Sequence, residues 1–218
     1  MFSYPPKAFF NKVMPKNKIY GFAKPSRSIQ NKFVSQIEQL VWAYKLAPET
    51  INLSARGFVQ EIQVFDVLLR GNTISEDVLL TMDKSVVHPV FFQLHYNDKI
   101  RFAAAYKRAN EADPGKWVVS DYFFTDWSPA KAPLLPLPVA LDLNALYEDI
   151  FRAHIMLASR KGETTRELVD RASLIKQQER EVLRLEADLQ REKQFNRKVE
   201  INAQLREVKN ELAALYLS

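Results

Sequence analysis

Apolar residues recur at helical spacing from Ser28 onward. The stripe is formed by Phe33, Ile37, Leu40, Val41 and Tyr44. This spacing puts the side chains on one face of a helix. It therefore predicts an amphipathic helix, and Pro48 ends that helix because proline cannot donate the next backbone hydrogen bond.

The next segment favours a strand followed by a helix. Residues 61–69 (EIQVFDVLL) are rich in β-branched and aromatic side chains, which predicts a buried strand. Gly71 and Asn72 then turn the chain, and Ser75 is placed to cap a short helix. The inward-facing residues of this helix are Val78, Leu79, Met82 and Val86.

A β-hairpin is predicted in the centre of the chain. Residues 89–96 and 99–107 have strand composition, and the intervening Asn97 and Asp98 tolerate positive φ. An Asp-Pro-Gly turn leads into a third strand at 116–126.

Together these elements predict an α+β fold. We expect a small, mostly antiparallel sheet of about four strands, in which the strand at 61–69 lies beside the three later ones. Helices flank this sheet and are expected to pack on one of its faces.

A proline-rich segment follows the sheet. Four prolines within 128–138 (SPAKAPLLPLP) exclude regular helix or sheet and predict a stiff connector. A further apolar stripe then predicts an amphipathic helix docked on the sheet domain, before Lys161 and Gly162. Its residues are Leu143, Leu146, Tyr147, Ile150, Phe151, His154 and Ile155.

The C-terminal residues 165–218 contain no Pro and no Gly, which predicts a long helical tail. Polar residues at 192–198 interrupt an otherwise regular apolar seam. This break is compatible with a helical hairpin or with one helix of about 75 Å, and either needs a partner for its apolar stripe. The predicted partner-binding residues are Leu185, Leu189, Phe195, Ile201, Leu205, Val208, Leu212 and Leu215.

These boundaries predict five parts of the chain. They are a basic aromatic N-terminal arm (1–27), an α+β sheet domain (28–127), a Pro-rich connector (128–141), a docked helix (142–160) and a coiled-coil tail (164–218).

Basic residues are concentrated at the N-terminus of the chain. The first 33 residues contain seven Lys or Arg and no acid, interleaved with aromatic residues, while the whole chain has a formal net charge of +5. Cations neutralise phosphates and aromatic rings stack on bases, so a nucleic-acid contact is one interpretation. The other is a solvated arm whose aromatic residues pack on the core. The predicted contacts are Lys7, Lys12, Lys16, Lys18, Lys24 and Arg27.

Catalytic and metal chemistry is weakly represented. The chain has no Cys, and His88, His95 and His154 do not have zinc-ligand spacing, so we expect no metal site and no cofactor. No catalytic residue is identified. A run of about twenty apolar residues is absent, so we expect a cytoplasmic protein that does not enter a membrane.

Carboxylates near the strands keep one enzymatic alternative open. They are Glu61, Asp66, Asp98, Asp121 and Asp126. Convergence of several on Mg²⁺ would suit phosphodiester cleavage, although turn formation and strand-end solubility account for the same residues.

Several strings together resemble a known family. They are 11–16 (NKVMPK), 42–53 (WAYKLAPETINL), 61–65 (EIQVF), 105–108 (AYKR), 125–127 (TDW) and 193–200 (KQFNRKVE). Taken in order they resemble a bacterial family of domains of unknown function, number forty-three ninety-one. The resemblance implies genes encoded near helicases and DNA methyltransferases of restriction or phage-defence systems, and a helicase or methyltransferase subunit as partner. It implies no catalytic residues.

Three functional hypotheses follow. The leading one is a non-enzymatic accessory or adaptor subunit of a bacterial DNA-processing system, which binds a partner or dimerises through its tail. The first alternative is a metal-dependent nuclease subunit that uses Asp66 with Glu61. The second is an oligomerisation scaffold without DNA contact.

Overall fold

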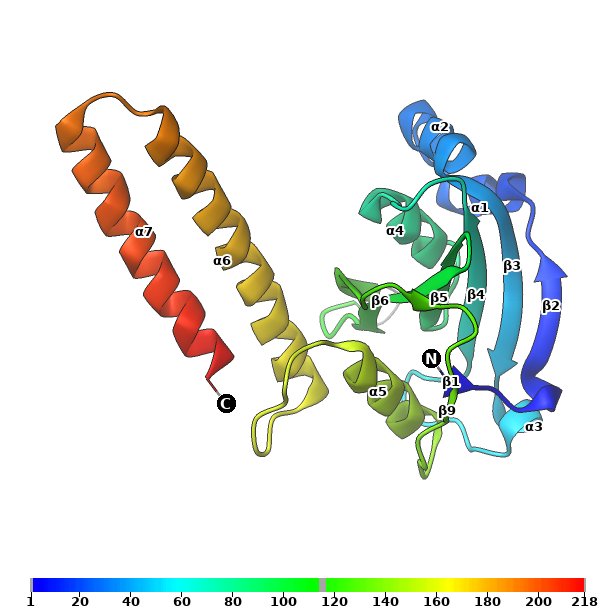
Figure 1. Ribbon diagram of the computed structural model, residues 1–218. Helices are drawn as coiled ribbons and strands as arrows, with labels where there is room; N and C mark the ends of the chain where they lie inside the picture. Colours follow the sequence, from blue (N-terminus) through cyan, green and yellow to red (C-terminus); the bar gives the residue numbers. More distant parts are fainter. Residues whose placement is uncertain (1, 114–116, 218) are drawn as a thin grey trace. The chain divides into compact units, whose positions relative to one another are not determined.

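The computed structural model describes residues 2–113 and 117–217 (Figure 1). They form two compact units, which divide after Ile155. Each unit is described by itself. None of the helices within the described ranges combines the length and apolarity needed to cross a membrane.

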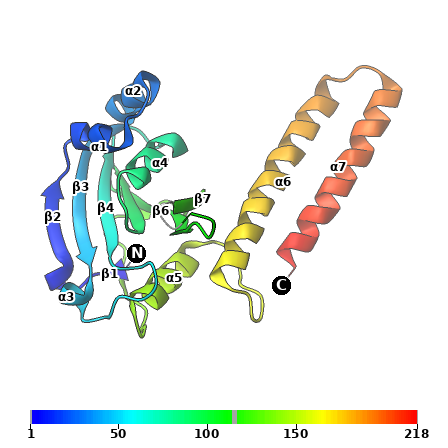
Figure 2. The same cartoon turned by 180° about the vertical axis from the view of Figure 1, so that it is seen from behind.

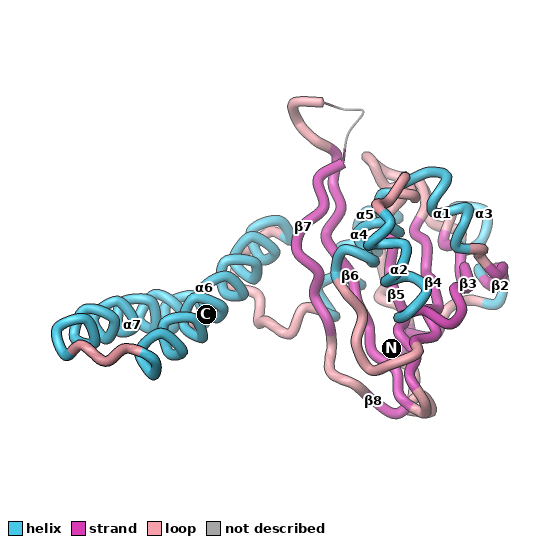
Figure 3. Tube along the Cα trace, turned by 90° about the horizontal axis from the view of Figure 1, so that it is seen from above, coloured by secondary structure: helices cyan, strands magenta, loops and turns pink. Residues whose placement is uncertain are grey.

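The first unit is built on a mixed sheet that is mostly antiparallel (Figure 3). Its strands run in the order β2 (Phe9–Val13), β3 (Ile37–Leu46), β4 (Ile62–Leu69), β5 (Val90–Tyr96), β6 (Lys99–Ala109) and β7 (Trp117–Phe124), with β8 (Ser128–Pro129) also paired to β6. Within this sheet, β4 and β5 form the one parallel pair among the described strands, and a helix connects these two strands.

The predicted α+β class is confirmed, but the expectation of about four strands is wrong. The described sheet has seven strands. The arm supplies β2, the proline-rich connector supplies the two-residue β8, and β3 occupies the region predicted as helix.

The misassigned strand has a physical explanation. The helix from Ser28 exists, but α2 (Arg27–Gln36) ends where β3 begins. Register shifts in the pairing of β3 with β4 lie between Ile37 and Gln39 and between Trp42 and Tyr44. Bulges of this kind replace the two-residue alternation of a strand. The buried residues of β3 therefore recur every third position, which imitates a helical stripe.

Helices cover both faces of the sheet, which differs from the expected single face. On one face, α1 (Lys16–Ala23), α2 and α4 (Glu76–Lys84) share a core with Phe65 and Phe92. On the other, Tyr147 of α5 (Leu143–His154) lies 5.7 Å from Phe91, measured between ring centroids. Phe91 and Phe92 are neighbours on one strand, so their side chains point to opposite faces.

Short elements complete the first unit. They are β1 (Phe2–Ser3), η1 (Pro6–Ala8), α3 (Pro48–Ile51) and β9 (Leu135–Pro136). β1 pairs with β9 in parallel, so the first described residues and the connector hold each other in place.

The docked helix α5 begins and ends as its sequence suggests. Asp142 caps it by accepting a hydrogen bond from the Ala145 amide at 2.9 Å. At its other end, the imidazole of His154 stacks on Phe102 with 3.4 Å between ring centroids, and its Nδ1 donates a hydrogen bond to the Ile150 carbonyl at 2.6 Å. Phe2 packs edge-on against the same imidazole.

The second unit is a helical hairpin (Figure 2). Its helices are α6 (Thr165–Arg191) and α7 (Phe195–Tyr216). They run antiparallel, since Lys209 pairs with Glu186 at 2.8 Å and Tyr216 donates to Glu179 at 2.6 Å. The hairpin is therefore the observed alternative, and the polar break at 192–198 contains its turn.

Arginines fix the open end of this hairpin. Arg160 donates to the carbonyl oxygens of Ala214 and Leu215 in the last turn of α7 and to that of Leu217, the C-cap residue. Arg171 donates to the Leu215 carbonyl at 3.0 Å and to the Glu163 carboxylate at 2.7 Å. Cations at the carbonyl end of a helix stabilise it through the helix dipole.

Stability of the first unit should depend on the titration of His154. Burial lowers the pKa of His154 from 6.5 to about 4. Between these values the unfolded chain binds the proton and the folded chain does not, so stability falls as the pH drops, by about 2 to 3 kcal/mol near pH 4.5. His154→Phe removes the titration and keeps a ring beside Phe102. Urea unfolding at several pH values should give a flatter profile for the variant, and parallel profiles would contradict this expectation.

Candidate nucleic-acid interface

The six cations predicted to contact nucleic acid all lie on folded elements. Lys7 is in η1, Lys12 in β2, Lys16 and Lys18 in α1, Lys24 at the C-cap of α1, and Arg27 at the start of α2. The arm is thus a structured segment of the first unit, which we call the N-terminal basic segment (residues 7–27).

Most of these cations are exposed and carry no ion pair. Lys7, Lys12, Lys18, Lys24 and Arg27 are exposed, and no described carboxylate lies within 4.0 Å of their charged atoms. Lys16 is half-buried, and its Nζ donates to the Ile37 carbonyl at 2.7 Å. Exposed cations without acidic partners leave a net positive potential on this surface.

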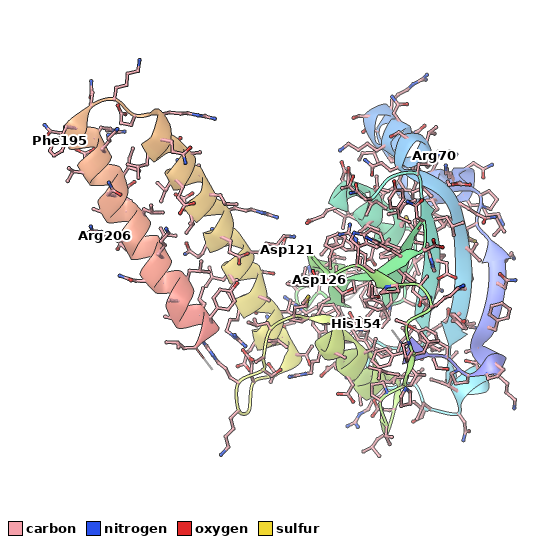
Figure 4. All side chains as sticks on the ribbon, viewed as in Figure 1. Arg70, Asp121, Asp126, His154, Phe195 and Arg206 are labelled. Atoms are coloured by element: carbon pink, nitrogen blue, oxygen red, sulfur yellow. The ribbon has the colours of Figure 1, made fainter. Side chains whose placement is uncertain are left out.

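Arg70 joins this surface from a distant part of the sequence. It follows β4 and is exposed (Figure 4), and its Nε donates to the Val34 carbonyl of α2 at 3.2 Å. Burial and the nearby Arg70 charge lower the pKa of Lys16. Sequence reasoning missed Arg70 because its neighbours in space come from residues far away in the chain.

A row of aromatic rings crosses one face of the sheet from its edge inward. It consists of Phe10, Trp42, Phe65, Phe92 and Tyr122, which we call the aromatic row. Successive ring centroids are 4.3, 6.1, 6.4 and 6.3 Å apart. Phe10 at the outer end is 42% exposed, and the Lys12 ammonium lies 6.0 Å from its centroid. The row therefore links the basic segment to the core.

A cavity of about 250 Å³ opens over the middle of the aromatic row, and we call it the α1 pocket. Trp42, Phe65 and Phe92 line it from the sheet. Lys18 and Phe22 line it from α1, and the 85–88 segment after α4 forms another wall. Apolar pockets with a few polar groups are the default binding sites of a protein.

A buried lysine holds the wall of this pocket. The Nζ of Lys107 on β6 donates to the Asp83 carboxylate at 3.0 Å, to the Val86 carbonyl, and to the His88 carbonyl at 3.3 Å. Both ionic side chains are buried, with exposed side-chain fractions of 1% for Lys107 and 0% for Asp83. Tyr122 also donates to Asp83, at 2.8 Å. Burial lowers the pKa of Lys107 and raises the pKa of Asp83.

The carboxylates considered for a nuclease do not converge. Glu61 accepts from Gln63 at 2.6 Å and pairs with Lys45 at 3.2 Å. Asp66 instead accepts from Gln93 at 2.8 Å and lies 3.0 Å from His95. Gln63 and Asp66 are an odd number of positions apart on β4, so their side chains point to opposite faces of the sheet. Glu61 binds the Gln63 side chain and is therefore on the face opposite to Asp66.

The other candidate ligands are also dispersed. Asp98 lies in the turn between β5 and β6, while Asp121 is in β7 and Asp126 follows it (Figure 4). His88 borders the α1 pocket and His154 lies at the end of α5. Across the part of the chain that the structure describes, no three His, Asp or Glu side chains are grouped to hold a metal ion.

The predicted partner-binding residues divide into three groups in the hairpin according to their exposure. Leu185 and Leu205 are buried, and Leu189, Ile201, Val208, Leu212 and Leu215 are half-buried. Phe195 is 78% exposed at the closed end of the hairpin (Figure 4). Part of the predicted seam is thus covered within one chain.

The chain was compared with families, curated proteins and solved structures. A family model described as Domain of unknown function (DUF4391) matches residues 2–212. No curated protein and no solved structure shows detectable similarity to the chain.

The buried pair beside the pocket gives a stability prediction. Lys107→Met leaves the Asp83 carboxylate buried without its cation, and breaking such a pair lowers the free energy of unfolding by about 3 to 5 kcal/mol. Adding Asp83→Asn should recover part of this loss. Lys32→Met is the control, since it breaks the exposed pair with Asp77 and should cost at most about 1 kcal/mol. Urea unfolding measures all of these changes, and equal losses at Lys107 and Lys32 would contradict the prediction.

Proposed function

The chain belongs to the family described as a domain of unknown function (DUF4391), and because that description states no activity, we propose a function from the chemistry of the described surface. The protein is a non-enzymatic accessory subunit of a bacterial DNA-processing system of restriction or phage-defence type. Its N-terminal basic segment contacts nucleic acid, and its helical hairpin docks a protein partner.

One observation carries the nucleic-acid part of the proposal. The exposed cations of the N-terminal basic segment have no described acidic partner and are fixed to a sheet edge and two helices. A fixed array of unpaired cations releases counterions from a phosphate backbone without the entropic cost of ordering a flexible arm. Arg70 extends the same array and supports the same interpretation.

The hairpin supports the partner part of the proposal. Its described surface exposes Leu183, Phe195 and Val199, with exposed fractions of 67%, 78% and 54%. Exposed apolar side chains of this size favour burial against another protein. Phe195 and Val199 are one helical turn apart on α7, so they lie on one face.

Reversing three charges of the basic segment tests the nucleic-acid contact. The variant carries Lys7→Glu, Lys12→Glu and Lys18→Glu, all at exposed positions. Each phosphate contact contributes about 0.9 to the slope of log K against log salt, so three lost contacts should reduce that slope by about 3 and weaken binding strongly. Fluorescence anisotropy with labelled DNA at several salt concentrations measures both quantities.

A matched control carries the same change of charge in the second unit. It has Lys161→Glu, Lys193→Glu and Arg206→Glu, which are also exposed. We expect it to bind DNA with a slope close to that of the wild type. Equal losses in the two triple variants would show that only total charge matters, and wild-type protein that does not bind DNA at low salt would refute the proposal.

Substitutions in the hairpin separate its stability from its docking surface. Leu205 is only 8% exposed, so Leu205→Ala should destabilise the hairpin by about 2 to 5 kcal/mol. Phe195→Ala removes an exposed ring and should leave the unfolding of the hairpin unchanged. Thermal unfolding followed by circular dichroism measures both. Destabilisation by Phe195→Ala would mean that this ring serves the hairpin and is not available to a partner.

A further inference from the structure

We propose that the α1 pocket holds one unpaired base of single-stranded DNA while the strand's phosphates lie on the N-terminal basic segment. This inference rests on the proposed function and specifies its ligand. The basic segment and the pocket are continuous, because α1 contributes Lys18 and Phe22 to both.

The interior of the pocket suits a flat aromatic ligand. Trp42 and Phe65 are nearly parallel, with an interplanar angle of 23° and 6.1 Å between their centroids. The indole orientation is fixed, since Trp42 Nε1 donates to the Tyr44 carbonyl at 3.0 Å. A base that stacks on a fixed aromatic ring gains binding energy whatever its sequence.

Polar groups at the pocket can contact the edge of a base. The amide of Gln63 is held by its donation to Glu61 at 2.6 Å. Ser85 and His88 line the opposite wall, and the Ser85 hydroxyl, which donates to the Met82 carbonyl at 2.6 Å, keeps its lone pairs as acceptors. The backbone of that wall is held by Lys107, which binds the carbonyls of Val86 and His88. Groups that are already positioned bind a ligand at a lower entropic cost.

The volume and the mouth of the pocket favour a single base over a larger molecule. Its volume of about 250 Å³ lies below the range of about 300 to 1,000 Å³ typical of sites for drug-sized ligands. Phe22, which is 78% exposed, and Lys18 lie four positions apart on α1, so a ring and a cation are neighbours at the mouth. A base in a duplex is stacked and paired, and it reaches such a pocket only when it is unpaired.

The test compares DNA ligands that share phosphates and differ in their bases. Full-length protein is titrated with a labelled oligodeoxythymidine, an abasic oligonucleotide of the same length, and a blunt duplex. We expect the oligodeoxythymidine to bind at least about five-fold more tightly than the abasic strand, which corresponds to one stacked base. Trp42 fluorescence should be quenched on binding, and Trp42→Phe should remove that part of the signal.

Phe22→Ala is the decisive variant because its ring is exposed and supports no buried core. The Phe22→Ala variant should bind the oligodeoxythymidine about as tightly as the abasic strand. The salt dependence of its DNA binding should be unchanged. Phe195→Ala is the matched control, since both rings are 78% exposed, and it should retain the preference.

The outcomes separate this inference from the proposed function. Equal binding of the oligodeoxythymidine and the abasic strand, with both weakened by Lys7→Glu, Lys12→Glu and Lys18→Glu, would overturn the base pocket and leave the charge-based contact standing. Thymidine monophosphate binding as tightly as the strand would overturn the assignment to a strand and indicate a free nucleotide. No binding of any DNA at low salt would overturn both.

Discussion

The packing around helix α4 in the first unit depends on the buried contact between Lys107 and Asp83. Lys107 lies on β6, Asp83 lies in α4, and the carbonyls of Val86 and His88 belong to the segment that leads into β5. The pairing of β6 with β7 shifts register between Ala105 and Lys107. Such a bulge frees backbone groups, and the Lys107 amide donates to the Tyr147 hydroxyl of α5 at 2.7 Å. One residue therefore connects the helices on both faces of the sheet.

This arrangement constrains the fold more than it stabilises it. A buried ion pair gains little over a well-packed apolar pair, because desolvation offsets the attraction between its charges. The pair acts through geometry, because the Lys107 ammonium donates to one carboxylate and to several carbonyls, and a shift of the 85–88 segment would remove two of these acceptors. That segment is a wall of the α1 pocket, so the shape of the pocket depends on a residue that does not line it.

Local signals in the sequence predicted the elements whose residues follow simple periods. Strands β4, β5 and β6, helices α4 and α5, and the break in the tail were predicted from such signals and are present. Strand β3 was not, because its bulges give it the spacing of a helix. Lys107 falls on the polar side of an alternating pattern, and only the three-dimensional arrangement shows that it is buried. Among the residues around the α1 pocket, Lys18 was indicated by its charge. The pocket itself was not predicted, because its walls come from α1, from strands β3 to β5 and from the 85–88 segment, which are distant from one another in sequence.

The folding of the basic segment changes what its charges can do. A disordered arm with the same cations would bind any polyanion and lose conformational entropy on doing so. Here β2 and α1 hold the cations beside exposed Phe10 and Phe22, at the outer end of the aromatic row and at the mouth of the α1 pocket. Under the function proposed above, electrostatic attraction, which salt weakens, and stacking, which salt hardly affects, would act on one DNA strand from adjacent positions. On that proposal, the salt dependence and the base dependence of binding arise from different side chains, and we expect each to be removed by substitution without the other.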